Sequence, residues 1–181
     1  MSAKGEGSMG VPGRDECLQM LRDQGCDEAV IRHCIAVTDL AVRIAKKCRA
    51  DVRLTEAGAL LHDIGRGQSH GMDHAVVGAR LARELGLPDT VVGIIERHIG
   101  GGLTGAEARR LGLPRKSYLP RTLEEKIVAH ADNLMSGDRR TSLSESVGHL
   151  IRKRELEAAR RVLELHKELS AACGINVDDV V

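Results

Sequence analysis

The sequence has 181 residues, the length of one ordinary domain, with 27 basic and 26 acidic side chains and a formal net charge of +1. This balance gives no support for binding nucleic acid or a membrane surface through bulk charge, so neither partner is expected. Hydrophobic residues make up 42% of the chain, yet it has no Phe or Trp and only one Tyr. The core must therefore be aliphatic, which favours packed helices over a β-sandwich.

The amino terminus and the cysteines indicate a cytoplasmic protein. Residues 1–13 have no apolar stretch, so we expect a flexible lead-in rather than a signal peptide. No segment is long enough to span a membrane. The cysteines contain no C-x-x-C pair, and we interpret them as buried, reduced thiols. They are Cys17, Cys26, Cys34, Cys48 and Cys173.

The first predicted helices cover residues 14–24, ended by Gly25, and residues 27–48. The second has apolar residues at helical spacing, which defines one face. These are Val30, Cys34, Val37, Ala41, Ile44 and Cys48. His33 lies beside that face.

Six further helices are expected, because glycines, prolines and capping boxes divide the rest of the chain. Their predicted ranges are 55–62, 72–85, 88–98, a short helix from 104, 122–135 and 142–172. No strand pattern is found. The result is a single all-α bundle of about seven or eight helices. We expect a domain over 14–140, with a C-terminal helix in 141–181 that packs on it or on a second subunit.

Six residues form the candidate metal-binding set: His33, His62, Asp63, His74, His98 and Asp132. A lone histidine beside an apolar face is more often structural, so the set matters more than its members. Imidazole and carboxylate ligands together suit Fe, Mn, Ni, Co or Zn. The set is large enough for two such ions with a carboxylate between them, which could together clamp a phosphoryl group.

The other four histidines are weaker candidates. His70 competes with His74, four residues later. His130 is two residues from Asp132 and points to another helix face, so a structural role is favoured. His149 and His166 lie on the polar C-terminal helix and are expected to be exposed.

The pattern resembles the HD-domain superfamily of metal-dependent phosphohydrolases over about residues 27–140. Its most specific part is L-L-H-D-I-G-R at 60–66, preceded by His33 and followed by Asp132. The H-x-x-x-G-A segment from His74, and His98 followed by glycines, resemble the dinuclear subgroup. That subgroup includes HD-type diadenosine tetraphosphate hydrolases.

The resemblance implies two divalent transition-metal ions, with Asp63 bridging them and supplying the catalytic centre. A metal-bound hydroxide would attack a phosphoester or phosphoanhydride bond, and Arg66 would stabilise the phosphoryl charge. A nucleotide or dinucleoside polyphosphate is the expected small-molecule substrate. Residues 103–121 look like an insertion, whose Arg115, Lys116 and Arg121 are candidate substrate contacts. A solvated surface is an equal alternative for that segment.

Two other functions stay open. Some HD-type proteins use a di-iron centre to activate oxygen, and a non-catalytic nucleotide-sensing module could keep the metal for structure. The apolar residues of the C-terminal helix also leave a homodimer open.

Overall fold

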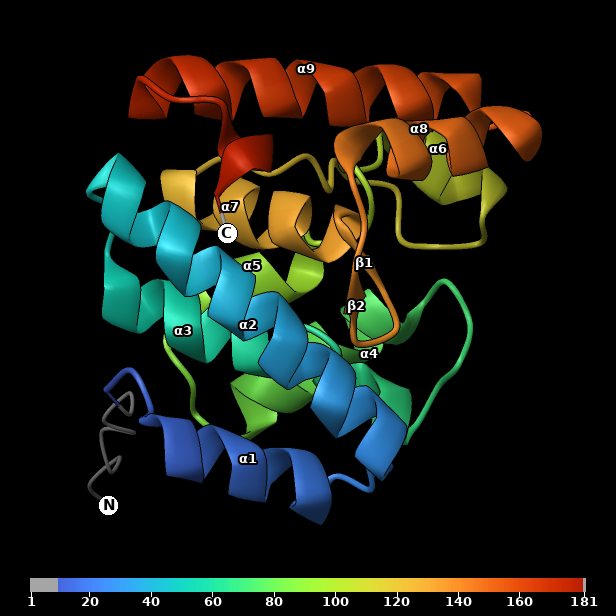
Figure 1. Cartoon of the computed structure of the whole chain (residues 1–181). Coiled ribbons are helices and arrows are strands. Elements are labelled where there is room, and N and C mark those ends of the chain that lie inside the picture. The colour runs from blue at the N-terminus through green and yellow to red at the C-terminus, as the bar shows by residue number, and fades with distance from the viewer. Residues whose placement is uncertain (1–9, 181) are drawn as a thin grey trace, which may run out of the picture.

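The computed structural model describes residues 10–180, so most of the predicted lead-in over 1–13 lies outside the described residues. Within this range the chain forms nine α-helices, two short 3₁₀ helices and one β-hairpin (Figure 1). The elements are α1 (Arg14–Asp23), α2 (Glu28–Cys48), α3 (Val52–Leu61), η1 (Ile64–Gly67), α4 (His74–Glu84), α5 (Asp89–Glu96), α6 (Gly105–Arg110), α7 (Leu123–Asn133), β1 (Met135–Ser136), β2 (Arg139–Arg140), α8 (Leu143–Arg152), α9 (Leu156–Cys173) and η2 (Val177–Asp179).

The predicted all-α bundle is confirmed, with differences at two helices. The helix expected at 55–62 begins at Val52, because the Asp51 side chain accepts a hydrogen bond from the Leu54 amide and caps it. The helix expected at 142–172 is two helices, α8 and α9. Arg154 adopts a left-handed backbone conformation, with φ of 62°, and this separates them.

A short antiparallel hairpin, which the sequence does not predict, follows α7. Met135 pairs with Arg140, and Ser136 pairs with Arg139. Two-residue strands are too short to show an alternating pattern, so their sequence carries no strand signal. Gly137 in the turn has φ of +61°, a conformation that glycine adopts without strain.

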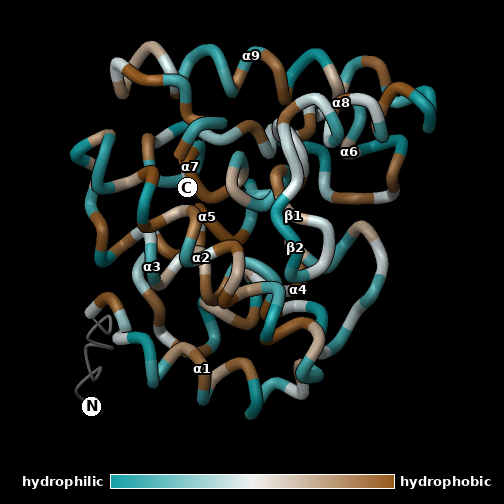
Figure 2. Tube along the Cα trace, viewed as in Figure 1, coloured by the Kyte–Doolittle hydropathy of each residue, from teal (hydrophilic) through white to brown (hydrophobic). Residues whose placement is uncertain are grey.

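The core is aliphatic, as predicted, and α2 contributes to both of its main clusters. On one side, Ile44 of α2 belongs to a buried cluster with Ile127 of α7 and Leu169 of α9. On the other side, Ile31 belongs to a cluster with residues of α1, α3, α4 and α5, including Leu60. Figure 2 shows these apolar stretches along the helices, with hydrophilic stretches between them. The helix that carries His33 therefore contributes side chains to both clusters.

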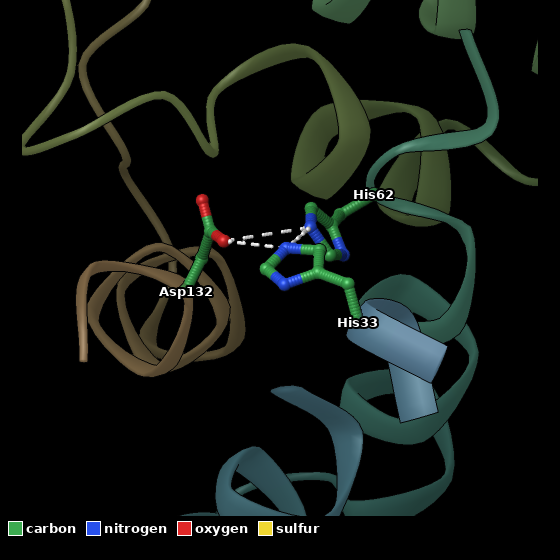
Figure 3. A group of neighbouring side chains, drawn as sticks. All are labelled: His33, His62 and Asp132. Carbon is green, nitrogen blue, oxygen red and sulfur yellow. Dashed lines mark hydrogen bonds and ion pairs between the residues drawn. The ribbon is translucent and has the colours of Figure 1, made fainter. Parts of the chain in front are cut away.

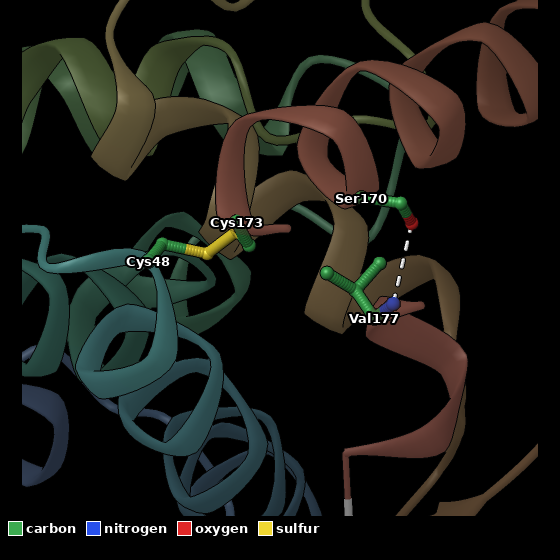
Figure 4. Close-up of a disulfide and its surroundings, with 4 residues drawn as sticks. All are labelled: Cys48, Ser170, Cys173 and Val177. Atoms are coloured by element: carbon green, nitrogen blue, oxygen red, sulfur yellow. Dashed lines mark hydrogen bonds between the residues drawn. A yellow bond between two sulfur atoms is a disulfide. The ribbon is translucent and has the colours of Figure 1, made fainter. Parts of the chain in front are cut away.

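One cysteine expectation is wrong. Cys48, at the end of α2, forms a disulfide with Cys173, at the end of α9 (Figure 4). The two residues are 125 positions apart, so only the packing of α9 across the bundle brings the thiols together. Cys17, Cys26 and Cys34 are buried free thiols, as expected. Burial raises the pKa of Cys17 to about 12, which keeps that thiol protonated.

The C-terminal helix α9 lies across one end of the bundle (Figure 1). Its Leu165 and Leu169 are buried in the same cluster as α2 and α7. Leu156 on α9 and Ile151 on α8 remain exposed, at 61% and 52%. Among the helices of residues 10–180, none is both long and apolar enough to cross a membrane.

Candidate metal centre

His62 and Asp63 lie where α3 gives way to η1. His62 follows the last residue of α3 with helical backbone angles, whereas Asp63 leaves the helix, with φ of −100° and ψ of 15°. Both residues are buried, at 0% and 4% exposed. This change of helix type directs two consecutive side chains toward one site.

Gly65 allows η1 to pack directly on α4. A Cβ atom on Gly65 would overlap the His74 carbonyl oxygen and would lie 2.6 Å from the Gly78 amide nitrogen. The glycines of the I-G-R and H-x-x-x-G-A segments therefore meet each other. Their contact brings Asp63 close to His74, at the start of α4.

His33, His62 and Asp132 converge from three segments of the chain (Figure 3). The His33 Nε2 atom lies 3.0 Å from Asp132 Oδ1 and 3.2 Å from His62 Nε2. The His62 Nε2 atom lies 3.6 Å from the same carboxylate oxygen. We call these three residues the His33 half of the centre.

His74 and His98 form a second group, which we call the His74 half. Their Nε2 atoms are 3.1 Å apart. The side chains are 5% and 2% exposed, compared with 17% for His33, 0% for His62 and 21% for Asp132. The second group is therefore uniformly buried, whereas the His33 half has two partly exposed members.

Asp63 lies between the two halves, with one carboxylate oxygen toward each. Its Oδ1 atom is 3.2 Å from His74 Nε2 and 3.5 Å from His98 Nε2. Its Oδ2 atom is 3.8 Å from His33 Nε2 and 3.7 Å from His62 Nε2. A carboxylate in this position can bridge two ions, the arrangement expected from the family resemblance.

All four histidines use Nδ1 in the same way. Each Nδ1 lies 2.7–2.8 Å from a backbone carbonyl oxygen. A carbonyl oxygen only accepts hydrogen bonds, so each Nδ1 carries the proton and donates it. In the neutral rings, the Nε2 lone pairs are therefore left free and face the centre.

This arrangement requires positive charge between the rings. Unprotonated Nε2 atoms face each other at 3.1 and 3.2 Å, and His33 Nε2 also faces a carboxylate oxygen. Lone pairs at such distances repel each other unless a proton or a metal ion lies between them. The Oδ1 atom of Asp63 is also buried without a hydrogen-bond donor among the described residues. Four imidazoles and two carboxylates therefore fit transition-metal ions.

Ionised carboxylates bring negative charge into this buried site. Burial alone would raise the pKa of Asp63, but His62 and two further imidazoles hold that pKa well below its usual range. Asp132 also has a lowered pKa, because hydrogen bonds from His33 and His62 outweigh burial. Burial would lower the pKa of His33, but the neighbouring Asp132 raises it. The carboxylates are thus ionised and attract positive charge, which a bound metal would supply in place of protons.

Arg66, the predicted catalytic arginine, lies beside Asp63. Its Nε donates to Asp63 Oδ2 at 2.8 Å, and its Nη2 lies 3.4 Å from His74 Nε2. The side chain is 31% exposed. It can therefore touch both the bridging carboxylate and a group that arrives from solvent.

The other three predicted substrate contacts lie on the segment between α6 and α7. Arg115 and Arg121 are exposed, and Lys116 donates to Glu96 at 2.7 Å. Within residues 10–180, no hydrogen bond or ion pair connects these three side chains to the six candidate ligands. Arg115 shares a hollow of about 430 Å³ with two arginines of α6. Their contact with substrate stays a prediction.

Two of the remaining histidines, His70 and His149, are exposed. His130 is fully buried, and burial, together with the charges of His166 and Arg140, lowers its pKa to about 3. His166 is only half-buried, so its expected exposure is wrong. Its Nδ1 contacts His130 Nε2 at 3.3 Å, because α9 packs on α7.

Sequence reasoning missed the Gly137 carbonyl oxygen, which accepts from His33 Nδ1 at 2.7 Å. The 104 positions between these residues leave no local pattern that could reveal the pair. The other three histidines take carbonyl partners three positions earlier, at Ala59, Gly71 and Ile95. Those bonds follow from helix and turn geometry and were open to prediction.

The HD domain family model matches residues 30–136. This range covers more than half of the chain and contains all six candidate ligands. The chain therefore belongs to the HD domain family.

Two curated relatives are similar along most of this chain. A Picrophilus torridus protein named tRNA (cytidine(56)-2'-O)-methyltransferase is 46% identical over 170 residues, which cover 94% of this chain and 50% of that protein. An uncharacterized protein of Methanocaldococcus jannaschii is 43% identical over 163 residues, which cover 86% of this chain and 96% of that protein. The chain thus spans about half the length of the first relative and nearly all of the second.

A solved structure with the same fold is the HD domain of the L. monocytogenes phosphodiesterase PgpH, in complex with cyclic-di-AMP. The TM-score is 0.57, with 16% identity, and the alignment covers 86% of this chain and 94% of that chain. At this identity the similarity shows the shared fold.

Proposed function

We propose that this protein is a metal-dependent phosphohydrolase that cleaves a phosphoester or phosphoanhydride bond in a nucleotide. The observation that carries the proposal is the geometry of Asp63, whose two carboxylate oxygens face two separate groups of imidazole Nε2 atoms. Membership of the HD domain family supports the same reaction class.

The side chains of the centre would act in distinct ways. His33, His62 and Asp132 would hold one ion, His74 and His98 a second, and Asp63 both. Bound divalent ions lower the pKa of water and neutralise charge on a phosphoryl group.

Arg66 would hold the phosphoryl oxygens. Its guanidinium is fixed at one side by the Asp63 carboxylate, and its 31% exposure leaves donors for an incoming phosphate. Arginine is suited to this role because its planar group can donate two parallel hydrogen bonds.

A dinucleoside polyphosphate is the first substrate to test. The names of the relatives add two further probes, cyclic-di-AMP and a tRNA-derived oligonucleotide. The formal net charge of +1 favours a small substrate over an extended polyanion, so cleavage of the oligonucleotide should be the weakest.

The test combines metal analysis of the purified protein with a product-release screen over these probes. We expect Fe, Mn, Ni, Co or Zn at up to two ions per chain, and turnover that stops when a chelator removes them. Asp63→Asn should lose turnover, whereas Asp39→Asn, an exposed change on α2, should keep it.

Two results would replace this proposal by another function. Oxygen consumption by a redox-active iron centre, without product release from any phosphate probe, would support an oxygenase. Tight nucleotide binding without turnover in the metal-loaded protein would support a sensing module.

A further inference from the structure

His33 differs from the other three histidines in the origin of its Nδ1 partner. The partners of His62, His74 and His98 lie three positions earlier in the chain. The partner of His33 is the carbonyl of Gly137, in the turn between β1 and β2. His33 therefore keeps its ring orientation only while that hairpin stays in place.

We infer that the β1–β2 hairpin is a positioning element that controls metal binding by the His33 half of the centre. Its Gly137 carbonyl holds the His33 ring in the Nδ1-protonated form and turns Nε2 toward Asp132 and His62. This inference rests on the proposed metal centre, but it concerns only one half of that centre.

The end of α7 and the hairpin that follows it hold the His33 ring from two sides. Asp132, near the end of α7, lies 3.0 Å from Nε2, and Gly137 accepts from Nδ1 at 2.7 Å. Between them, the Leu134 carbonyl accepts from the Thr141 amide at 2.8 Å, which closes the base of the hairpin. A shift of the hairpin would thus turn the ring away from its carboxylate partner.

The hairpin is anchored to the C-terminal segment. Arg140 Nη2 donates to the Asp178 carbonyl oxygen at 3.1 Å and approaches its carboxylate at 3.4 Å. The Asp178 carboxylate also accepts from the Leu143 amide at the start of α8. Asp178 of η2 thus contacts Arg140 of the hairpin, and Gly137 of the same hairpin contacts His33.

Among residues 10–180, the Nδ1 bonds of the His74 half lie outside this series of contacts. His74 and His98 take their carbonyl partners from Gly71 and Ile95, beside α4 and within α5. Displacement of the hairpin should therefore weaken one metal position and leave the other unchanged. That selectivity distinguishes positioning from general destabilisation.

Two substitutions of Gly137 form a matched pair. Asparagine tolerates its φ of +61°, whereas a β-branched valine does not. A Cβ atom at this position meets nothing within 4 Å, so the two variants differ in backbone preference rather than in crowding. Gly137→Val should displace the carbonyl, and Gly137→Asn should keep it.

The first measurement is the protonation of the His33 ring nitrogens in the metal-free protein, by NMR at alkaline pH. We expect the proton on Nδ1 in the wild type and in Gly137→Asn, and a shift toward Nε2 in Gly137→Val. The second measurement is calorimetric titration with Mn²⁺. Gly137→Val should weaken one of two sites by about 10–100-fold, the usual effect of losing a partner of a metal-binding histidine.

A second pair covers the case in which Gly137→Val does not fold. Arg140→Met removes the anchor to Asp178, whereas Arg139→Met changes its exposed neighbour on the same strand. Only Arg140→Met should weaken Mn²⁺ binding by the His33 half.

Three results would overturn the inference. They are equal weakening of both Mn²⁺ sites, an unchanged His33 proton position in Gly137→Val, and equal effects of the two arginine substitutions. Two tight wild-type sites with turnover, both unaffected by these variants, would refute the hairpin role and leave the proposed function intact. A wild-type protein that binds no Mn²⁺ and none of the other candidate metals would refute both.

Discussion

The His74 half of the candidate centre holds two imidazoles, the His33 half holds two imidazoles and a carboxylate, and His33 is supported differently from the other histidines. His74 and His98 are almost fully buried, and each binds a carbonyl three positions earlier. His33 is 17% exposed and binds the carbonyl of Gly137 in a distant hairpin. Local bonds form as soon as the surrounding turn forms, whereas the distant bond requires the folded chain.

This difference indicates that the geometry of His33 can change while the geometry of His74 and His98 stays the same. A change in the hairpin or the C-terminal segment can reach His33 without disturbing His74. Asp63 is the exception, because it contacts both halves. Substitutions can therefore be sorted by whether they affect both halves, one half, or neither.

The largest effect is expected from Asp63→Asn, which removes the one carboxylate charge that both halves share. Metal content should fall toward zero, and turnover should fall by more than about 100-fold, since loss of an outer partner alone costs about 10–100-fold. Metal analysis and product release measure both. A variant that keeps two ions would contradict the bridging position of Asp63.

Single-half substitutions should come next. Asp132→Ala removes the carboxylate of the His33 half, and His74→Ala removes an imidazole of the other half. Each should reduce a two-ion stoichiometry to about one, measured by calorimetric titration with Mn²⁺. If either variant loses both ions together, the halves are a single cooperative site and the comparison fails.

Arg66→Ala should lower turnover without changing the metal content of either half. Removal of one donor to the developing phosphoryl charge costs about 100–1,000-fold in kcat. Arg66→Lys should recover part of the loss, because it restores the charge but not the paired donors. Steady-state kinetics on metal-loaded protein provide the test, and loss of bound metal in Arg66→Ala would assign the residue to the centre itself.

Removal of the Cys48–Cys173 disulfide should affect stability rather than the centre. The bond closes a long loop, so Cys173→Ser should lower the free energy of unfolding by about 2–4 kcal/mol. Cys48 and His33 are 15 positions apart on α2, or about 22 Å at about 1.5 Å per residue. Denaturant unfolding should show the loss, while Mn²⁺ affinities should change by no more than about twofold.

The smallest effect on the centre is expected from Glu107→Gln, which removes an ion pair. In this pair, Glu107 of α6 and Arg161 of α9 lie 2.8 Å apart. Hydrogen bonds from Thr104 and Arg161 outweigh burial and lower the pKa of Glu107 from 4.5 to about 2. The unfolded chain thus binds the proton more tightly, so the stability from this carboxylate is complete above pH 4.5 and is lost as pH falls toward 2.

Glu107→Gln should reduce the dependence of unfolding free energy on pH in that range. Denaturant titrations of both proteins, from pH 5 down to about pH 2, measure the difference. Identical pH profiles would show that the Glu107 carboxylate adds no stability.

Much of the fold could be predicted because its signals are local. The apolar spacing of α2 and the capping boxes at Thr104 and Ser142 depend on residues three or four positions apart. The break between α8 and α9 was missed, because it depends on the left-handed conformation of Arg154, a residue type that does not require it. The hairpin was missed because its strands are too short for a pattern.

The sequence by itself determined the six candidate ligands and their order along the helices, and the local Nδ1 bonds of His62, His74 and His98 were open to prediction from it. Helix and turn geometry fix such contacts within a few residues. Only the tertiary structure decided that Gly137 supports His33 and that Cys48 meets Cys173, pairs 104 and 125 positions apart. Contacts at that separation depend on how whole helices pack, and no local pattern records them.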